Sequence, residues 1–178
     1  MSRIVSVFGG ASPLPDSPAY DDARRLGRLL AEAGCVVMTG GYMGTMEAAS
    51  RGAAEAGGHV IGVTCEAIER FRKAGANPWV KEEIKYPTLR ERLNHLVEKC
   101  DAAIALPGGV GTLSEVALTW SFMQTREIGT KPLVLVGAGW RATLDEFLRS
   151  SDGYVRESDP ALLTFVADVD AAARVVSK

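Results

Sequence analysis

The residues most suggestive of chemistry lie in PGGVGTLSE, residues 107–115, where three glycines and a threonine precede the carboxylate of Glu115. The stretch joins an apolar run to an expected helix start. Glycine there lets the backbone approach a ligand closely, while a helix N-terminus offers unpaired N–H groups and about half a unit of positive charge. An anion, above all phosphate, suits such a junction.

Glu115 has two possible roles in this stretch. Thr112-x-x-Glu115 has the spacing of a capping box, in which the glutamate accepts a hydrogen bond from the backbone N–H of Thr112. A carboxylate one turn beyond an anion site could instead face the ligand. Spacing alone favours the capping role.

Two further glycine clusters, FGGASP (8–13) and TGGYMGTMEAA (39–49), also follow apolar runs. In a doubly wound sheet such strand-to-helix junctions lie at the carboxyl edge, so the three loops can converge on one crevice. Each cluster taken singly is explained equally well by tight turns and helix caps. Three clusters at one edge favour a shared ligand site.

The glycine spacing disfavours two familiar classes of nucleotide site. GGVGT lacks the Lys-Ser/Thr ending of a P-loop, which argues against triphosphate chemistry. Neither FGGAS nor GGYMGT completes GxGxxG, and the second expected strand ends in Thr39-Gly40-Gly41 instead of the acidic residue that binds a dinucleotide ribose. NAD is therefore not expected as a cofactor.

A helix is predicted over residues 88–100, where Thr88 and Glu91 have capping-box spacing. Its apolar positions recur at helical spacing and predict one buried stripe, made of Leu89, Leu93, Leu96, Val97 and Cys100. Arg90 and Arg92 flank opposite borders of that stripe at comparable angles. Periodicity does not choose between them, and an arginine at such a border is commonly a solvated side chain.

The elements that must position these residues alternate along the chain. Apolar runs at 4–8, 36–38, 59–63, 102–106 and 133–136 predict buried strands, and amphipathic stretches separate them. In the first such stretch Ser17 is the expected N-cap, Pro18 the first helical residue and Gly34 the C-terminal stop. Residues 66–87 are the least regular, with room for a short helix and an extra loop or strand. The expected fold is α/β, a doubly wound, Rossmann-like parallel sheet in a single domain spanning 1–178.

Composition limits the partners. With 47% hydrophobic residues and a net charge of −2, the chain has no basic run to bind nucleic acid. No signal segment or membrane span is apparent, so we expect a cytoplasmic protein with no membrane partner. Three cysteines without CxxC spacing predict buried, reduced thiols, and neither they nor the two histidines suggest a metal site. We expect no metal and no cofactor.

PGGVGTLSE fits the PGGxGTxxE signature of the LOG (lonely guy) family, cytokinin riboside 5′-monophosphate phosphoribohydrolases long mislabelled as lysine decarboxylases. The chain also resembles that family in VSVFGGASP, in GGYMGTMEAASRGAAEAGGHVIGV and in LTWSFMQTREIGTKPLVLV. Together these cover most of residues 4–137. Two positions depart from the family: TLRERL replaces the usual M-H-x-R-K, and GTMEAA replaces GLMG. With these two departures the chain is similar to a broader bacterial branch of the family, some of whose members resemble molybdenum cofactor carrier proteins.

The resemblance implies site residues. The family's catalytic pair is an arginine fifteen residues before the signature proline and the signature's glutamate, which correspond here to Arg92 and Glu115. This register separates Arg92 from Arg90. The glycines would hold a 5′-phosphate, and Glu115 would face the ribose. The residues expected to bind substrate are Gly10, Ser12, Gly40, Gly41, Gly44, Gly108, Gly109, Gly111 and Thr112.

The implied activity is hydrolysis of the N-glycosidic bond of a purine nucleoside 5′-monophosphate to free base and ribose 5-phosphate. The alternative is a carrier or sensor that binds a phosphorylated nucleotide or pterin in the same crevice without turnover. Decarboxylation is disfavoured because a pyridoxal enzyme needs a Schiff-base lysine and none lies in the glycine loops. The resemblance, with surplus apolar helix surface that includes Val116, Trp120 and Met123, also implies a homodimer.

Overall fold

The protein is described by a computed structural model, which covers residues 2–72, 74–151 and 153–177. Its seven strands form one parallel sheet in the order β4-β3-β2-β1-β5-β6-β7. The strands are β1 (Ile4–Phe8), β2 (Val36–Thr39), β3 (Val60–Cys65), β4 (Glu82–Tyr86), β5 (Ala102–Ala105), β6 (Leu133–Val136) and β7 (Thr164–Val166). This is the doubly wound α/β fold that the sequence predicts.

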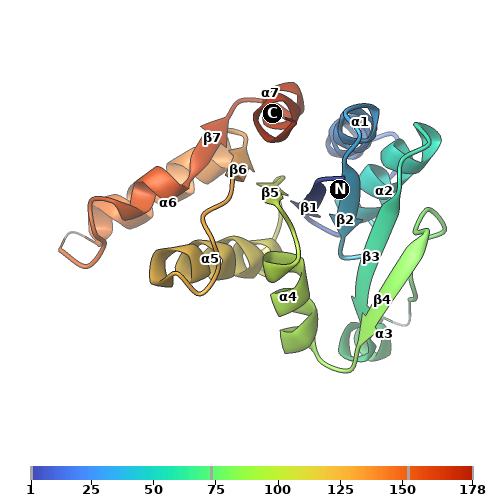
Figure 1. Cartoon of the computed structure of the whole chain (residues 1–178), viewed down its shortest axis with the longest axis horizontal. Helices are drawn as coiled ribbons and strands as arrows, with labels where there is room; N and C mark the ends of the chain where they lie inside the picture. The colour runs from blue at the N-terminus through green and yellow to red at the C-terminus, as the bar shows by residue number, and fades with distance from the viewer. Residues whose placement is uncertain (1, 73, 152, 178) are drawn as a thin grey trace.

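Helices cover both faces of the sheet (Figure 1). They are α1 (Pro18–Glu32), α2 (Thr45–Glu55), α3 (Glu66–Arg72), α4 (Leu89–Glu98), α5 (Val110–Thr125), α6 (Ala138–Ser150) and α7 (Val169–Val176), with a 3₁₀ turn at Asp159–Leu162. One apolar core joins the sheet to α1, α2 and α7, and a second joins it to α4, α5 and α6. The strands β1, β2, β3, β5 and β6 are thus buried on both sides, which explains their continuous apolar runs.

The strand order reverses beside β1, which pairs with β2 on one side and with β5 on the other. In open α/β sheets the crevice outside the carboxyl ends of the strands at such a switch point is the usual ligand site. The three glycine clusters follow β1, β2 and β5. The fold therefore gathers them at this point.

Most element boundaries agree with the sequence prediction. Ser17 caps α1 by accepting from the N–H of Tyr20, and Gly34, at φ +77°, ends the helix region. The irregular segment 66–87 contains α3 and the edge strand β4, as its composition allowed. The strand β7 was not predicted, because its three half-buried residues are too few to show a pattern.

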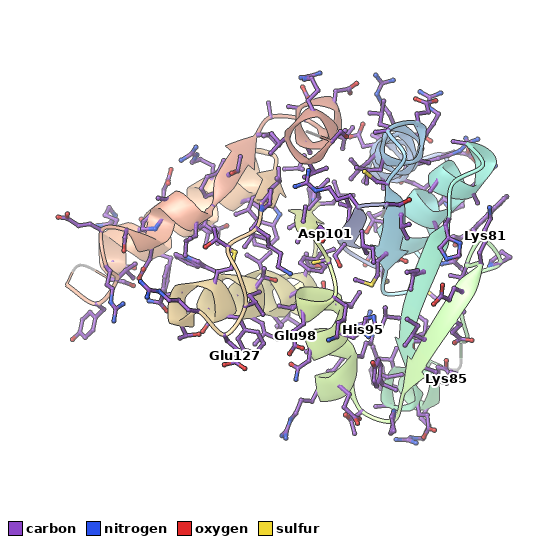
Figure 2. The ribbon with its side chains drawn as sticks, in the orientation of Figure 1. Lys81, Lys85, His95, Glu98, Asp101 and Glu127 are labelled. Carbon is purple, nitrogen blue, oxygen red and sulfur yellow. The ribbon has the colours of Figure 1, made fainter. Side chains whose placement is uncertain are left out.

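The β4 edge of the sheet is charged. Figure 2 shows Lys81 and Lys85 toward opposite ends of this strand, and Lys85 donates to Glu69 of α3 at 2.9 Å. Charged side chains on an edge strand discourage pairing with a second sheet.

The three cysteines are free and buried, as predicted. Among the described residues no helix is long and apolar enough to cross a membrane. The same residues contain no group of three or more histidine, cysteine or acidic side chains placed to hold a metal ion.

Candidate functional site

A cavity of about 430 Å³ opens at the carboxyl ends of the central strands. Its wall is formed by the first and third glycine loops, by Tyr42 and Met46 of the second cluster, and by side chains of α3 and α4. The sequence-predicted residues that line it are Gly10, Ser12, Arg92, Gly109, Gly111, Thr112 and Glu115. Segments far apart in the chain therefore meet in one crevice.

Four of the predicted binding glycines, Gly40, Gly41, Gly44 and Gly108, are not among the lining residues of this cavity. Gly44, at φ +71°, lies so close to the first loop that a Cβ would overlap Gly10 and Ala11. At Gly40 a Cβ would overlap the Nη2 atom of Arg92. Gly40 and Gly44 are small because neighbouring protein atoms pack against them behind the site. The sequence had suggested a different reason, close approach of the backbone to a ligand.

The N-terminus of α5 borders the cavity without a side-chain cap. Gly109 is its N-cap, and the first helical hydrogen bond runs from the N–H of Leu113 to the Gly109 carbonyl. The N–H groups of the first turn, from Val110 to Thr112, have no acceptor within the helix. These donors and the helix dipole make the lip of the cavity a favourable place for an anion.

The predicted capping box at Thr112 and Glu115 is wrong. Because Gly109 caps α5, Thr112 is its third residue and Glu115 its sixth, one turn beyond the first-turn donors. Gly109, which adopts an extended conformation, starts the helix earlier than the Thr-x-x-Glu spacing suggested. The side chain of Glu115 is consequently free to point into the crevice, where it lines the cavity.

The structure brings Arg92 and Glu115 together. The Nη1 atom of Arg92 lies 3.6 Å from Oε1 of Glu115, and both side chains are more than nine-tenths buried. The Nε of Arg92 donates to the Val63 carbonyl at 2.8 Å, and its guanidinium lies 5.7 Å from the ring centre of Tyr42. Within the described residues, the Nη atoms of Arg92 and the carboxylate of Glu115 have no hydrogen-bond partner. Such unused polar groups in a cavity are available to a ligand.

Burial raises the pKa of Glu115 to about 7, against the opposing effect of the Arg92 charge. Desolvation disfavours the charged carboxylate, and one arginine beyond hydrogen-bonding distance does not compensate for it. Near neutral pH the carboxyl group is poised between its protonated and ionised forms. This is a common property of groups that act in acid–base or charge-stabilising chemistry.

Helix α4 resolves the choice between its two arginines. Arg90 is exposed, whereas Arg92 is buried. The predicted apolar stripe is also partly wrong, because Leu89 is 45% exposed at the cavity mouth and Arg92 occupies the buried face with Leu96 and Val97. Periodicity failed here because the face of α4 near its N-terminus borders a polar crevice and not the core.

Tyr42 and Asn77 are among the residues in and behind the site that the sequence did not single out. Tyr42 lines the cavity, and Asn77 donates from its side-chain amide to the carbonyls of Gly41 at 3.0 Å and Tyr42 at 2.9 Å. The Asn77-Pro78 dipeptide is a turn signal. Nothing in its spacing indicated that the turn would hold the second glycine loop.

Apolar side chains complete the wall. The cavity is also lined by Ile68 and Phe71 of α3, Leu89 of α4 and Val110 of α5. The crevice thus has a donor-rich lip, a buried arginine and carboxylate, and an apolar flank. It could hold a small molecule with an anionic end and a less polar body.

Residues 2–151 match the SLOG cluster4 family. A rice protein (Oryza sativa subsp. japonica) named probable cytokinin riboside 5′-monophosphate phosphoribohydrolase LOGL5 is 33% identical over 93% of this chain and 67% of its own length. A Mycobacterium tuberculosis protein named cytokinin riboside 5′-monophosphate phosphoribohydrolase is 32% identical over 96% of this chain and 91% of its own.

Solved structures with the same fold include molybdenum cofactor proteins. The molybdenum cofactor binding protein of Rippkaea orientalis superposes with a TM-score of 0.78 at 26% identity, covering 99% of this chain and 96% of that one. The molybdenum cofactor carrier protein of Chlamydomonas reinhardtii superposes with a TM-score of 0.73 at 28% identity and the same coverage. The relatives therefore comprise proteins named as enzymes and proteins named as carriers.

Proposed function

Since the chain belongs to the SLOG cluster4 family and to the LOG family of its curated relatives, we propose that it hydrolyses purine nucleoside 5′-monophosphates at the N-glycosidic bond. Water adds to the anomeric carbon, the bond to the base breaks, and the base leaves with a proton. The products are free base and ribose 5-phosphate. The observation that carries the proposal is the buried Arg92–Glu115 pair beside an uncapped helix N-terminus.

The phosphate is held by the third glycine loop. The first-turn amides of α5, with Gly109, Gly111 and Thr112 at the cavity wall, supply donors and no side chain that competes for them. The first loop, through Gly10 and Ser12, forms the facing wall. No lysine or arginine reaches this lip from the three glycine loops, which fits one phosphate better than a polyphosphate.

Glu115 acts on the ribose. Cleavage of the glycosidic bond builds positive charge on the anomeric carbon, and an ionised carboxylate nearby stabilises that charge or activates the attacking water. The side chain lies about one helical turn beyond the phosphate donors, a separation that suits a ribose 5′-phosphate. Its carboxylate is buried and accepts no hydrogen bond within the described residues, so it is available to the substrate.

Arg92 orients the carboxylate and keeps part of it ionised. Its positive charge lowers the pKa of Glu115 against the effect of burial. The guanidinium is a poor proton donor because it scarcely deprotonates. Its free Nη groups also provide donors for substrate oxygens in the crevice.

The second candidate function is a carrier or sensor of a phosphorylated nucleotide or pterin. The likeness to the two molybdenum cofactor proteins over nearly the whole chain supports it. The same donor-rich lip would hold the phosphate of such a ligand. In this case the crevice binds without cleavage.

One experiment separates the two candidates. The purified protein is incubated with a panel of purine and pyrimidine nucleoside 5′-monophosphates, including N6-substituted adenosine monophosphates, and released base is measured by chromatography. The enzyme releases base from at least one purine member. Binding of nucleotides, measured by calorimetry, without release of base from any of them would favour the carrier.

The protein also acts as a homodimer in the cytoplasm under this proposal. Val116 and Met123, expected to be part of the surplus apolar surface, are buried in the core. Leu113, Trp120 and Phe147 border an apolar surface hollow of about 410 Å³, which a second copy would cover. Three buried free thiols suit a reducing compartment. Light scattering at micromolar concentration should give twice the chain mass of 18.9 kDa, and a monomer would contradict the dimer.

A further inference from the structure

Tyr42 is a large buried group in the crevice that the proposed chemistry leaves without a role. Its side chain is 1% exposed, and it lies in the second glycine loop between β2 and α2. The ring centre is 5.7 Å from the Cζ atom of Arg92, within the range of a cation–π contact. The second loop therefore touches the proposed catalytic pair through this ring.

The ring of Tyr42 is fixed at its far end. The phenolic O–H donates to the Cys65 carbonyl at 3.0 Å and accepts from the Cys65 N–H at 2.8 Å, both at the end of β3. The near end is fixed through the backbone, since the side-chain amide of Asn77 donates to the carbonyl of Tyr42 at 2.9 Å. A side chain held at both ends makes a rigid surface.

The guanidinium of Arg92 has few other contacts that hold it in place. Its hydrogen bond to the protein is from Nε to the Val63 carbonyl, which anchors one edge of the planar guanidinium and leaves the Nη edge without a hydrogen bond among the described residues. At 3.6 Å the contact with Glu115 is too long to be a hydrogen bond and restrains the guanidinium weakly. The guanidinium also lies against Gly40, where a Cβ would overlap Nη2.

We propose that Tyr42 is a positioning residue, whose ring, together with the space left by Gly40, holds the guanidinium of Arg92 toward Glu115. The aromatic ring contacts the guanidinium, and the phenolic hydroxyl anchors the ring to β3. The role in turnover rests on the proposed hydrolysis, whereas the geometric role does not. The second glycine loop is thus the support of the arginine and not a third phosphate loop.

The charged and titratable groups that shift the pKa values of Glu115 and Tyr42 can be named. Arg92 is the charge that acts on Glu115, and Glu69 of α3, Cys65 of β3 and Arg92 itself are the groups that act on Tyr42. Burial raises the pKa of the Tyr42 phenol, so it stays neutral at physiological pH. Changes in the ionisation of Glu115 on altering Tyr42 therefore report on the placement of Arg92.

The test compares three variants. Tyr42→Leu removes the ring and keeps an apolar side chain, Tyr42→Phe keeps the ring and removes the hydroxyl, and Trp79→Leu is the matched control. Trp79 lies under Arg51 with 5.4 Å from ring centre to Cζ, so it supplies the same contact outside the cavity. Two quantities are measured on folded protein: the pKa of Glu115, by carbon-13 NMR of labelled glutamate, and kcat and KM for the best nucleotide.

Loss of the ring should release Arg92 and raise the pKa of Glu115 above about 7. It should lower kcat about tenfold with KM changed less than about threefold, the size expected for one lost cation–π contact. Tyr42→Phe should rescue both quantities although it melts at lower temperature, and Trp79→Leu should leave both at wild-type values. Gly40→Ala places a Cβ against the guanidinium and should displace it from Glu115. This variant should therefore also raise the pKa of Glu115, and it tests the proposal even if Tyr42→Leu does not fold.

An unchanged Glu115 titration in both Tyr42→Leu and Gly40→Ala would overturn the positioning role. An equal shift in Tyr42→Phe and Tyr42→Leu would also overturn it, since the hydroxyl and not the ring would then be responsible. The NMR titration does not depend on turnover. A protein that releases no base but shows the expected titration shifts contradicts the proposed hydrolysis and keeps the positioning role.

Discussion

Two groups of arginine and glutamate side chains in this molecule have the same chemistry and opposite surroundings. Between α1 and α2, Glu55 accepts from Arg24 at 2.7 Å and from Arg51 at 2.9 Å at the protein surface. In the crevice, Glu115 faces Arg92 at 3.6 Å with both side chains buried. The surface group is fully paired and the buried group is not.

The pKa values follow the pairing. At Glu55 partial desolvation pushes the pKa up, but hydrogen bonds from Arg51 and Arg24 outweigh it and the pKa falls below its ordinary value. At Glu115 desolvation dominates and the pKa rises to about 7. An ion pair that stabilises a fold satisfies its hydrogen bonds, whereas one that awaits a ligand leaves them open at a cost in stability.

The largest expected difference between the two glutamates is in turnover. Glu115→Gln removes the charge beside the developing cation and should lower kcat at least a hundredfold, roughly 3 kcal/mol in the barrier. Glu55→Gln is the control and should change kcat less than about twofold, since its partners lie outside the cavity. Both rates come from base release under saturating nucleotide. Near wild-type turnover in Glu115→Gln would remove this residue from the chemistry.

The arginines should differ in the same way. Arg92→Ala leaves the carboxylate of Glu115 buried without a counter-charge, and it should reduce kcat by a similar factor of about a hundred. Arg90→Ala, two residues earlier and exposed, should stay within about twofold of wild type. The same base-release assay decides the point. Comparable losses in the two variants would mean that α4 contributes through its general charge and not through Arg92.

Stability should respond to the two glutamine substitutions with opposite sign. The folded protein keeps the proton of Glu115 up to about pH 7, whereas the unfolded chain loses it near 4.5. Between these values the folded state binds more protons, so the free energy of unfolding falls as pH rises. At pH 8 Glu115→Gln should therefore be more stable than wild type by up to about 3 kcal/mol, and near pH 4 the two should agree.

Glu55 has the opposite effect on the pH dependence of stability. Its lowered pKa means that the ionised form stabilises the fold above the unfolded value, and this contribution disappears as the pH falls through the folded value. Glu55→Gln should cost under about 1 kcal/mol at pH 7, the usual range for surface pairs. Urea unfolding at pH 4, 7 and 8 measures both variants. A Glu115→Gln protein less stable than wild type at pH 8 would contradict the picture of an uncompensated buried carboxylate.

The smallest expected effect is on anion binding. Phosphate or AMP at ten times its dissociation constant should raise the melting temperature by about 3–6 °C through preferential binding to the folded state. Gly109→Val should remove most of this shift. The new side chain meets no protein atom within 4 Å, so the variant folds while covering the N-terminus of α5.

Gly129→Val is the matched control for the anion site, since Gly129 has equally open space and lies outside both the crevice lining and the hollow that Gly109 borders. It should keep the full AMP-induced shift. A shift that persists in folded Gly109→Val places the anion elsewhere.

The amino-acid pattern was sufficient to predict the architecture and the edge of the sheet where a site would form. Buried parallel strands need apolar residues on both faces, so their runs are visible without any knowledge of the fold, and glycine clusters after β1, β2 and β5 mark the same edge. The resemblance to the LOG family, confirmed by the relatives, indicated Arg92 and Glu115; their catalytic role remains a prediction.

The local role of each of these residues depends on the assembled fold. Gly40 looked like Gly109 in the sequence, yet one makes room for a guanidinium and the other opens a helix N-terminus. The capping box at Glu115 failed for a related reason, because a neighbouring glycine started the helix earlier. Spacing along one chain records local geometry, whereas burial, the distance to Arg92 and the raised pKa of Glu115 arise from segments that meet only when the sheet assembles.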